Sequence, residues 1–355
     1  MPLMKAIQVD TPGAEFKLVQ KEIPEPGETE VRIKVEACGI CHGDAVIKEG
    51  HYPGISYPRV PGHEVVGRID KLGSKVSGWE TGQRVGVGWY GGPCLKCDTC
   101  KRGDLSNCES FLTTGISFDG GYAEYITAPM QGLAAIPDEL ISIEAAPLLC
   151  AGRTTFTALR NSGAQGGDLV AIQGLGGLGH LAVQFARKFG YHTVAISRGR
   201  EKEALAYQLG ANIYIDAEST DAAAELKKLG GARIILATAP NSKAISGLIN
   251  GLCQDGQLII VAWLSEPMQI SPWHLMGGRR SVKGWTARPT RNSSEDTLKF
   301  SVNSGIVPMV EVFPLEQAAL AFEKNDVIES AFQIGFKDGR ERLNFPESGI
   351  QKSIT

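Results

Sequence analysis

Short apolar runs alternate with helix-like stretches in the middle of the chain, from about residue 165 to residue 263. Runs suited to strands and stretches suited to helices follow one another at 169–173, 178–189, 193–197, 201–209, 213–215, 222–229, 234–237, 242–252 and 258–263. The strand runs are apolar on both sides, as expected of strands buried between two layers. This alternation predicts an α/β region, a doubly wound parallel sheet with helices on both faces.

The residues on either side follow a different pattern. Up to about residue 150, strand-like runs such as 31–37, 64–71 and 84–87 are broken by Gly, Pro and Asp. Beyond about residue 290 the chain is polar again, and we expect a short helix at 315–322, a strand at 331–336 and a fraying tail after Lys337. The predicted organisation is a β-rich domain over 1–152 with a lobe at 91–109, an inserted α/β domain over 153–290, and a return to the first domain over 291–355.

Composition narrows the class of protein. A chain of 355 residues suits two domains, or three, at roughly 150 residues each. The formal net charge of −3 speaks against binding to nucleic acid or to an anionic membrane surface. No apolar stretch reaches the roughly 20 residues of a membrane span, and no targeting segment is visible. We therefore expect a cytoplasmic protein, in which clustered cysteines are metal ligands rather than disulfides.

A glycine-rich turn follows the first strand of the α/β region. Gly174, Gly176 and Gly179 have the spacing G-x-G-x-x-G, with Gly177 and Leu178 between them, and a helix pattern follows. The first glycine permits a tight turn, the second lets the backbone approach a pyrophosphate, and the third lets helix and strand pack closely. Because a helix start also presents free N–H groups, the motif predicts a dinucleotide site; a purely structural turn is the weaker interpretation.

The next strand ends in Ser197 and Arg198, and Glu201 is the nearest acidic residue that follows. An NAD site usually offers an acidic residue near this strand end, for the ribose 2′-hydroxyl. A hydroxyl and a guanidinium suit the 2′-phosphate of NADP instead. The sequence therefore favours NADP(H) over NAD(H), and a merely solvated Arg198 is the alternative.

Four cysteines lie close together in the lobe. They follow C-x2-C-x2-C-x7-C at Cys94, Cys97, Cys100 and Cys108. Four thiolates can close a tetrahedral zinc shell and leave no open position, which describes a structural site.

A second set of metal-ligating residue types is spread along the chain. Cys41, His63 and Cys150 form a Cys2His set, which leaves a fourth position of a tetrahedral zinc open for water or substrate. Asp44 could accept a hydrogen bond from His63, and Glu64 could approach the metal. Taken singly, His63 is more often a structural histidine and Cys150 a small buried apolar residue.

These stretches together resemble the zinc-containing alcohol dehydrogenases of the medium-chain dehydrogenase/reductase superfamily. The matching stretches occur in the family's order at 39–44, 61–67, the lobe, 146–152 and 174–179. Residues 85–88 and the pair Ser197 and Arg198 are similar to the branch of cinnamyl-alcohol-dehydrogenase-like proteins and aldehyde reductases. The resemblance implies a Rossmann sheet inserted into a GroES-like catalytic domain, and a homodimer or homotetramer.

The resemblance also implies a role for single residues. Cys41, His63 and Cys150 would hold the catalytic zinc, with Glu64 as an alternate ligand and Asp44 orienting His63. His42 would lie near the cofactor pyrophosphate and Thr154 would contact the nicotinamide. An apolar substrate pocket would be lined by Trp89, Tyr90 and Trp285.

Two positions depart from the family pattern. Many relatives carry Ser or Thr where this chain has Gly43, so the proton of the alcohol must leave through water, the cofactor ribose, a nearby histidine or no dedicated group. Relatives often place an arginine at the start of the last strand, near the pyrophosphate, whereas here Arg340 comes too late for that role.

The predicted function is hydride transfer between a primary alcohol and its aldehyde, aliphatic or aromatic, with two zinc ions per chain. A polyol, sugar or secondary-alcohol dehydrogenase is the alternative on the same fold, and the three aromatic pocket residues disfavour a polyol. A zinc-binding redox sensor without turnover is the alternative of another class. One zinc per chain would favour the sensor and two would favour the enzyme.

Overall fold

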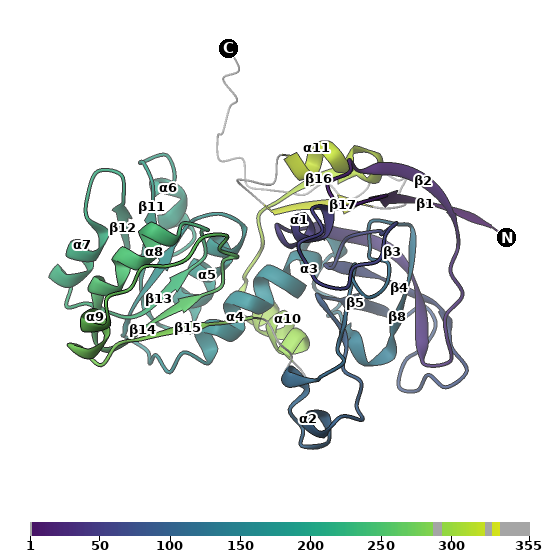
Figure 1. Ribbon diagram of the computed structural model, residues 1–355, viewed down its shortest axis with the longest axis horizontal. Coiled ribbons are helices and arrows are strands. Elements are labelled where there is room, and N and C mark those ends of the chain that lie inside the picture. The colour runs from purple at the N-terminus through teal and green to yellow at the C-terminus, as the bar shows by residue number, and fades with distance from the viewer. Residues whose placement is uncertain (1, 287–292, 324–328, 334–355) are drawn as a thin grey trace, which may run out of the picture.

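The computed structural model describes residues 2–286, 293–323 and 329–333. Two parts, each built around a sheet, lie side by side, with helices α4 (Arg153–Arg160) and α10 (Ser293–Ser304) drawn between them (Figure 1). The predicted mixed α/β architecture is confirmed, although the exact domain boundaries stay a prediction.

The first part is a parallel sheet of six strands in the order β12-β11-β10-β13-β14-β15. Helices separate most of its strands along the chain, which runs through β10 (Leu169–Gln173), α5 (Gly177–Lys188), β11 (His192–Ser197), α6 (Glu203–Gln208), β12 (Ile213–Asp216), α7 (Ala222–Lys228), β13 (Ala232–Ala237), α8 (Ser242–Leu248), β14 (Leu252–Ile260), α9 (Pro272–Met276) and β15 (Ser281–Gly284). The doubly wound sheet expected from the sequence is therefore present, and β15 is an additional strand that the pattern did not reveal.

Alternate residues of β10 lie in two different cores. Val170 and Ile172 belong to a buried cluster that includes Leu181 of α5. Ala171 belongs to another cluster, which includes Leu226 of α7. Because successive side chains of a strand point to opposite faces, α5 and α7 cover opposite faces of the sheet. This is why the strand is apolar on both sides.

The second part is a sheet of seven strands in the order β16-β17-β3-β4-β5-β9, with β8 beside β3. Its strands are β3 (Glu30–Ile40), β4 (Val65–Leu72), β5 (Arg84–Val87), β8 (Tyr125–Pro129), β9 (Leu133–Ala135), β16 (Val310–Pro314) and β17 (Glu329–Gln333), and the antiparallel pair β1 (Leu3–Gln8) and β2 (Lys17–Glu22) packs nearby. β17 is antiparallel to β3, so a segment from near the end of the chain completes a sheet that begins in its first third.

The last elements only partly follow the expected pattern. The helix expected at 315–322 is a 3-10 turn, Leu315–Gln317, followed by α11 (Ala318–Glu323). The strand expected at 331–336 is β17, while residues 334–336, Lys337 with the tail, and Arg340 lie outside the described residues.

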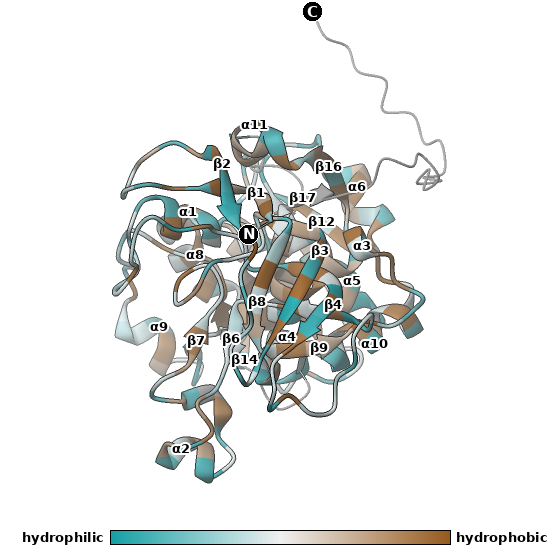
Figure 2. Ribbon diagram, turned by 90° about the vertical axis from the view of Figure 1, so that its right-hand side faces the viewer, coloured by the Kyte–Doolittle hydropathy of each residue, from teal (hydrophilic) through white to brown (hydrophobic). Residues whose placement is uncertain are grey.

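A lobe projects from the second part (Figures 1 and 2). It extends between β6 (Tyr90–Gly92) and β7 (Leu112–Thr113) and contains α2 (Asp98–Lys101) and a 3-10 turn, Leu105–Asn107. Leu95 is 51% exposed there, whereas Cys100 and Cys108 are buried. The lobe therefore has few buried apolar side chains to hold it together.

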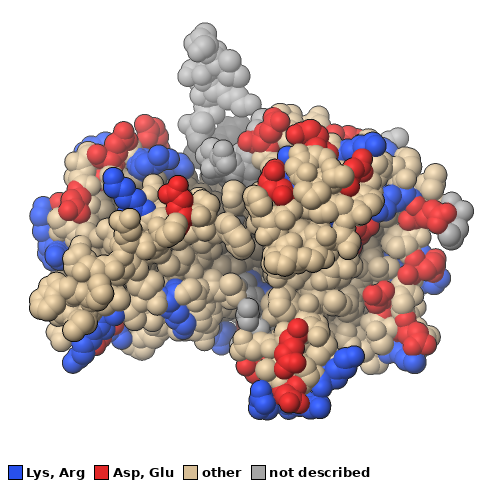
Figure 3. All heavy atoms as spheres, in the orientation of Figure 1, with Lys and Arg blue, Asp and Glu red and all other residues tan. Residues whose placement is uncertain are grey.

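Charges of both signs are interspersed on the face drawn in Figure 3, including the lobe. This distribution agrees with the small net charge of −3. Within the described ranges, every helix is too short or too polar to span a lipid bilayer.

Candidate active site

Two neighbouring strands bring three of the predicted ligands together. Cys41 follows β3 directly, and His63 and Glu64 directly precede β4. The two strands are antiparallel, with Cys38 opposite Val65, so the end of β3 meets the start of β4.

Cys150 reaches the same place from a helical segment. It lies in a π-helical turn, Leu148–Gly152, between α3 (Ser142–Pro147) and α4. Such wide turns are frequent at functional sites. The turn packs against α5, the helix that begins at the glycine-rich turn.

The resulting cluster fits a zinc ion. Cys41, His63, Glu64 and Cys150 each offer a ligand atom, and these atoms lie within 4.8 Å of one another. The two sulfur atoms are 3.9 Å apart, close to the roughly 3.8 Å between two thiolates bound at about 2.3 Å to one tetrahedral zinc. The fully buried His63 has no hydrogen-bond partner for its Nε2 among the described residues. A polar atom in that state is costly unless a ligand such as a metal satisfies it.

The packing around Glu64 depends on a glycine. Glu64 is fully buried, and a Cβ atom at Gly39 would lie 1.8 Å from its Oε2. Any other residue at position 39 would displace this carboxylate from the cluster. Glycine at this position is therefore required by close approach.

Asp44 forms hydrogen bonds with two residues of the cluster, Cys41 and His63. It is fully buried in the first turn of α1 (Gly43–Lys48), and its Oδ1 pairs with His63 Nδ1 at 3.0 Å. Its Oδ2 also accepts from the backbone N–H of Cys41 at 3.0 Å. The structure thus places Asp44 where the sequence suggested. His63 Nδ1 faces Asp44, which leaves Nε2 as the ring nitrogen available to a metal.

Tyr122 is a site residue that the sequence motifs did not indicate, and its hydroxyl donates to Asp44 Oδ2 at 2.8 Å. Its partner lies 78 residues away along the chain. The available signal was the pair Gly120 and Gly121, since a Cβ at Gly121 would lie 2.4 Å from Val65 Cγ2 and 2.9 Å from Cys38 Sγ. Adjacent glycines of this kind mark a close backbone approach.

The space at Gly43 is limited by two rings. A Cβ at this position would lie 3.0 Å from His63 Cε1 and 3.2 Å from Trp89 Cζ3. Trp89 meets the His63 ring edge to face, with centroids 4.8 Å apart. The absence of a side chain at Gly43 therefore leaves room for the Trp89 ring to pack on His63.

The other two predicted pocket residues are anchored elsewhere. Tyr90 is buried and stacks on Phe111 at 4.9 Å, with the Arg153 guanidinium 5.9 Å from its ring. Trp285 donates from Nε1 to Thr157 Oγ1 of α4 at 3.0 Å. Of the three predicted pocket residues, Trp89 is the one whose ring the structure places on His63.

The residues assigned to the cofactor lie on several elements. Thr154 is buried in the first turn of α4, and His42 precedes α1, where it lines a cleft with Phe16, Lys48 and Phe322. Their cofactor contacts stay predictions.

Each glycine of the dinucleotide motif has a distinct environment. Gly174 has φ +98°, and a Cβ there would lie 2.8 Å from Ala239 Cβ. A Cβ at Gly179 would lie 2.0 Å from the Gly174 carbonyl oxygen, whereas one at Gly176 would meet no atom within 4 Å. The first and third glycines therefore serve the protein's own packing, and the second faces open space beside the start of α5, as a bound pyrophosphate requires.

The end of β11 carries no carboxylate of its own. Ser197 is half-buried and Arg198 is exposed. Asp216, opposite Ser197 on β12, accepts from the N–H groups of Gly199 at 2.8 Å and Glu218 at 2.9 Å. The Glu218 N–H and the Ser219 hydroxyl lower the pKa of Asp216, so this carboxylate is engaged in holding the loop.

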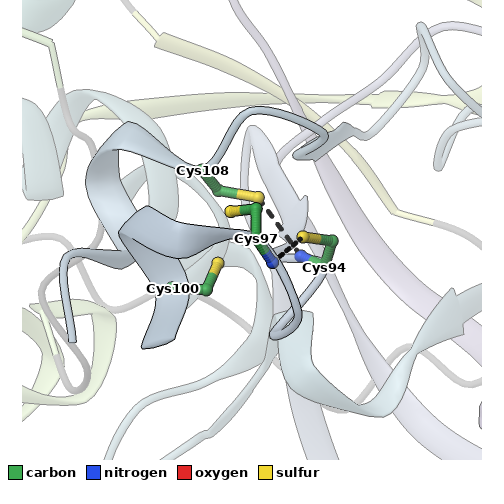
Figure 4. Close-up of side chains that lie close together, drawn as sticks. All are labelled: Cys94, Cys97, Cys100 and Cys108. Carbon is green, nitrogen blue, oxygen red and sulfur yellow. Dashed lines mark hydrogen bonds between the residues drawn. The ribbon is translucent and has the colours of Figure 1, made fainter. Parts of the chain in front are cut away.

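The four lobe cysteines converge as the spacing predicted (Figure 4). The backbone N–H of Cys94 donates to Cys108 Sγ at 3.3 Å, and that of Cys97 donates to Cys94 Sγ at 3.4 Å. The Thr99 hydroxyl and nearby N–H groups lower the pKa of Cys97 to about 6, while burial and the neighbouring thiols raise that of Cys100 to about 12. A cation is what would allow all four to ionise together.

Comparison with known proteins agrees with this geometry. Residues 27–138 match the family model of the alcohol dehydrogenase GroES-like domain, and residues 177–303 match that of zinc-binding dehydrogenases. The chain is 43% identical over 301 residues to an alcohol dehydrogenase of Aspergillus sp., covering 84% of this chain and 87% of that protein. It is 34% identical to a probable cinnamyl alcohol dehydrogenase of Arabidopsis thaliana, covering 84% of each.

The fold also matches solved structures. A cinnamyl alcohol dehydrogenase from Sorghum bicolor superposes with a TM-score of 0.83 at 28% identity, over 94% of this chain and 98% of that one. The GroES-like and Rossmann-like parts expected from the sequence are therefore confirmed. The chain belongs to the zinc-containing alcohol dehydrogenases of the medium-chain dehydrogenase/reductase superfamily and is an oxidoreductase that acts on alcohols.

Proposed function

We propose that this protein interconverts a primary alcohol, aliphatic or aromatic, and its aldehyde, with a catalytic zinc and NADP(H). The observation that carries the proposal is the convergence of Cys41, His63, Glu64 and Cys150 on one point. The turn with Cys150 packs against α5, so a metal and a dinucleotide would be held by neighbouring elements.

Each residue of the cluster would have its own role in binding the metal or the substrate. Cys41, His63 and Cys150 would hold the zinc, Glu64 would be an alternate ligand, and a fourth position would receive the substrate oxygen. When bound, the zinc polarises that oxygen and the nicotinamide donates or accepts the hydride. Asp44 orients His63 through the bond at Nδ1. Position 43 offers no hydroxyl, so the alcohol proton must leave by another route.

The substrate assignment rests on Trp89. Its ring packs on His63 and meets Tyr52 at 6.1 Å between centroids, which gives the metal cluster an aromatic wall. A flat apolar wall favours a substrate with an apolar tail over a polyol, which would need hydrogen-bonding side chains. A polyol, sugar or secondary-alcohol dehydrogenase remains the alternative, and a panel of alcohols and aldehydes separates the two.

The cofactor assignment rests on Ser197 and Arg198, which would bind the 2′-phosphate of NADP(H). NAD(H) is the alternative. Glu201 favours it, because its carboxylate lies beside Gly199 in the loop after β11, where a Cβ at Gly199 would be only 2.3 Å from Glu201 Oε2.

We also infer a cytoplasmic homodimer or homotetramer. Exposed Trp273 and Met276 on α9, 73% and 71% accessible, offer an apolar contact for a second copy, which light scattering would detect.

The decisive experiment replaces one predicted ligand of the catalytic zinc. Cys41→Ser should lower the zinc content from two ions per chain to one and abolish NADPH-linked turnover of aldehydes, followed at 340 nm. Cys253→Ser is the matched control, since Cys253 belongs to neither cysteine cluster of the described residues, and it should keep both zinc ions and full turnover.

Two results would contradict the proposal. A Cys41→Ser protein that turns over normally with one zinc would remove Cys41 from the catalytic site. A wild-type protein with one zinc and no turnover of any alcohol or aldehyde would favour a redox sensor, whose Cys41 and Cys150 thiols, 3.9 Å apart, would be the reactive groups.

A further inference from the structure

We propose that Tyr122 is a positioning residue for the catalytic metal, acting through Asp44 on both His63 and Cys41. The inference rests on the proposed function, since it requires a metal in the cluster of Cys41, His63, Glu64 and Cys150. Tyr122 itself would touch neither metal nor substrate.

The hydrogen bonds around Asp44 carry the argument. Oδ1 accepts from the N–H of Gly62 at 3.1 Å and pairs with His63 Nδ1 at 3.0 Å. Oδ2 accepts from the N–H of Cys41 at 3.0 Å and from the Tyr122 hydroxyl at 2.8 Å. One carboxylate therefore bonds to both segments that carry the ligands, and within the described part of the chain Tyr122 is its partner from outside those segments.

Burial makes this hydroxyl important to the carboxylate. Asp44 and Tyr122 are both fully buried, so water cannot replace a lost donor at little cost. An ionised carboxylate only accepts hydrogen bonds, which assigns the hydroxyl the donor role. Hydrogen bonds of this kind are stronger than those between neutral groups because the acceptor is charged.

The backbone of Tyr122 is held beside the segment that precedes His63, and from there its hydroxyl reaches Asp44. The N–H of Tyr122 donates to the Pro61 carbonyl at 3.0 Å, and its carbonyl accepts from the N–H of Ile7 at 2.8 Å. Gly62 has φ +100°, and a Cβ there would lie 2.4 Å from Tyr122 Cδ1. The ring thus packs directly on the backbone that precedes His63, and only glycine leaves room for it.

Removal of the hydroxyl should loosen the metal without removing a ligand. In Tyr122→Phe the ring still fills its space, but Oδ2 keeps only the Cys41 N–H, so the carboxylate can turn away from His63. Partners that orient a ligand in this way typically contribute about 10- to 100-fold to metal affinity or activity. We expect a loss of at least about tenfold in the affinity of the catalytic cluster for zinc, with the lobe site unchanged.

The experiment compares Tyr122→Phe with Tyr125→Phe in the whole protein. Tyr125 loses the same hydroxyl on β8, where it is half-buried under the Arg32 guanidinium and outside the Asp44 network. Zinc remaining per chain is counted after titration with a chelator, and the visible absorption bands of cobalt in the catalytic site are recorded. Tyr122→Phe should release one zinc at about tenfold less chelator and shift the cobalt bands, while Tyr125→Phe should match the wild type.

A second comparison tests whether Tyr122 acts through Asp44. In a double-mutant cycle with Asp44→Asn, the loss of zinc affinity in the double variant should equal that of Asp44→Asn alone, because both changes remove the same network. Independent effects would multiply and would overturn the inference. So would an unchanged zinc affinity and cobalt spectrum, or a loss of both zinc ions together with a general fall in melting temperature.

The outcome for the proposed function is read separately. If the wild-type protein binds no metal at Cys41, His63 and Cys150, the proposed function fails before any variant is compared. If the wild type binds it and Tyr122→Phe binds it equally well, only the role of Tyr122 is refuted.

Discussion

Arg198 is an exposed guanidinium at the end of β11, beside the half-buried Ser197. If it binds the 2′-phosphate, Arg198→Ala removes a charged hydrogen bond worth about 1.5–3 kcal/mol, so the Michaelis constant for NADP(H) should rise by about tenfold or more. NAD(H) has no phosphate at this position, and its Michaelis constant should change little. Initial rates with both cofactors at saturating aldehyde measure the two effects.

Arg200→Ala is the control for a general loss of positive charge. Arg200 is also exposed, and it lines a surface cavity with Glu203 and Tyr214. It should leave the ratio of the two Michaelis constants unchanged. Equal effects of Arg198→Ala on both cofactors would contradict the phosphate assignment and favour NAD(H) with Glu201.

At the scale of single residues, the sequence could predict those whose type and order along the chain identify their chemistry. Cys41, His63 and Cys150 were found because cysteine and histidine are the ligands zinc prefers. Tyr122 was missed, because its hydroxyl meets Asp44 only after two distant segments have folded together, and the adjacent glycines before it indicate a close approach but not its partner. The pocket was the least predictable part, since the direction of an aromatic side chain such as Trp285 depends on its packing, here against α4.

The contact between α5 and the segment before β16 depends on a neutral histidine. His180 Nδ1 pairs with the Gly176 carbonyl at 3.2 Å, and Nε2 accepts from the Met309 N–H at 3.0 Å. Protonation would put a hydrogen on Nε2 and break the second bond. Burial lowers the pKa of His180 to about 4, from an ordinary value of 6.5.

The sign of the pH effect follows from this shift. The folded state favours neutral His180, so its contribution is complete above pH 6.5 and is lost as the pH falls through about 4. Between pH 7 and pH 5 the wild type should lose about 2 kcal/mol of stability through this residue. His180→Gln, which does not titrate, should therefore show a smaller fall in melting temperature over that interval.

Loss of metal in acid affects both proteins, so the difference between them isolates His180. Gln184→Ala is a useful companion, because Gln184 bonds the same segment through Val307 at 3.0 Å but carries no titratable group. It should lower stability equally at pH 7 and pH 5. An identical fall in melting temperature for wild type and His180→Gln would show that His180 does not titrate as described.

Element prediction worked where burial and periodicity agree. Helix α5 was expected at 178–189 and spans Gly177–Lys188, since its apolar face packs on the sheet. Helix α10 was missed, because its buried face includes Ser293, Thr297 and Ser301. The hydroxyls of the last two donate to backbone carbonyls one turn earlier, at 2.7 and 2.8 Å, which lets polar residues be buried without a visible apolar stripe.

At the scale of the whole molecule, the order of strands and helices already indicated a sheet interrupted by a second domain. The pattern could not predict the pairing of β17. This strand pairs with β16, its neighbour in sequence, and also with the distant β3. Pairings between distant segments depend on packing, which local periodicity does not report. The lobe is the opposite case, because the four cysteines that converge in it lie close together in sequence.

The lobe therefore offers a test that separates folding from chemistry. Cys108→Ser should remove one zinc per chain, because it removes a ligand from a closed site whose binding energy is folding energy. With Leu95 exposed and few other apolar contacts, the metal-free lobe should open, and trypsin should cut at Lys96, Lys101 or Arg102 about tenfold faster or more.

The catalytic cluster should survive this change, because its ligands lie on β3, β4 and the π-helical turn rather than in the lobe. Aldehyde turnover per intact chain at 25 °C should stay within about threefold of the wild type, as expected of a change outside the reacting groups, while the melting temperature falls. Cys253→Ser provides the control for cysteine loss and should resist trypsin as the wild type does. Complete loss of turnover, with one zinc still bound and the rest of the chain folded, would mean that the lobe takes part in catalysis directly.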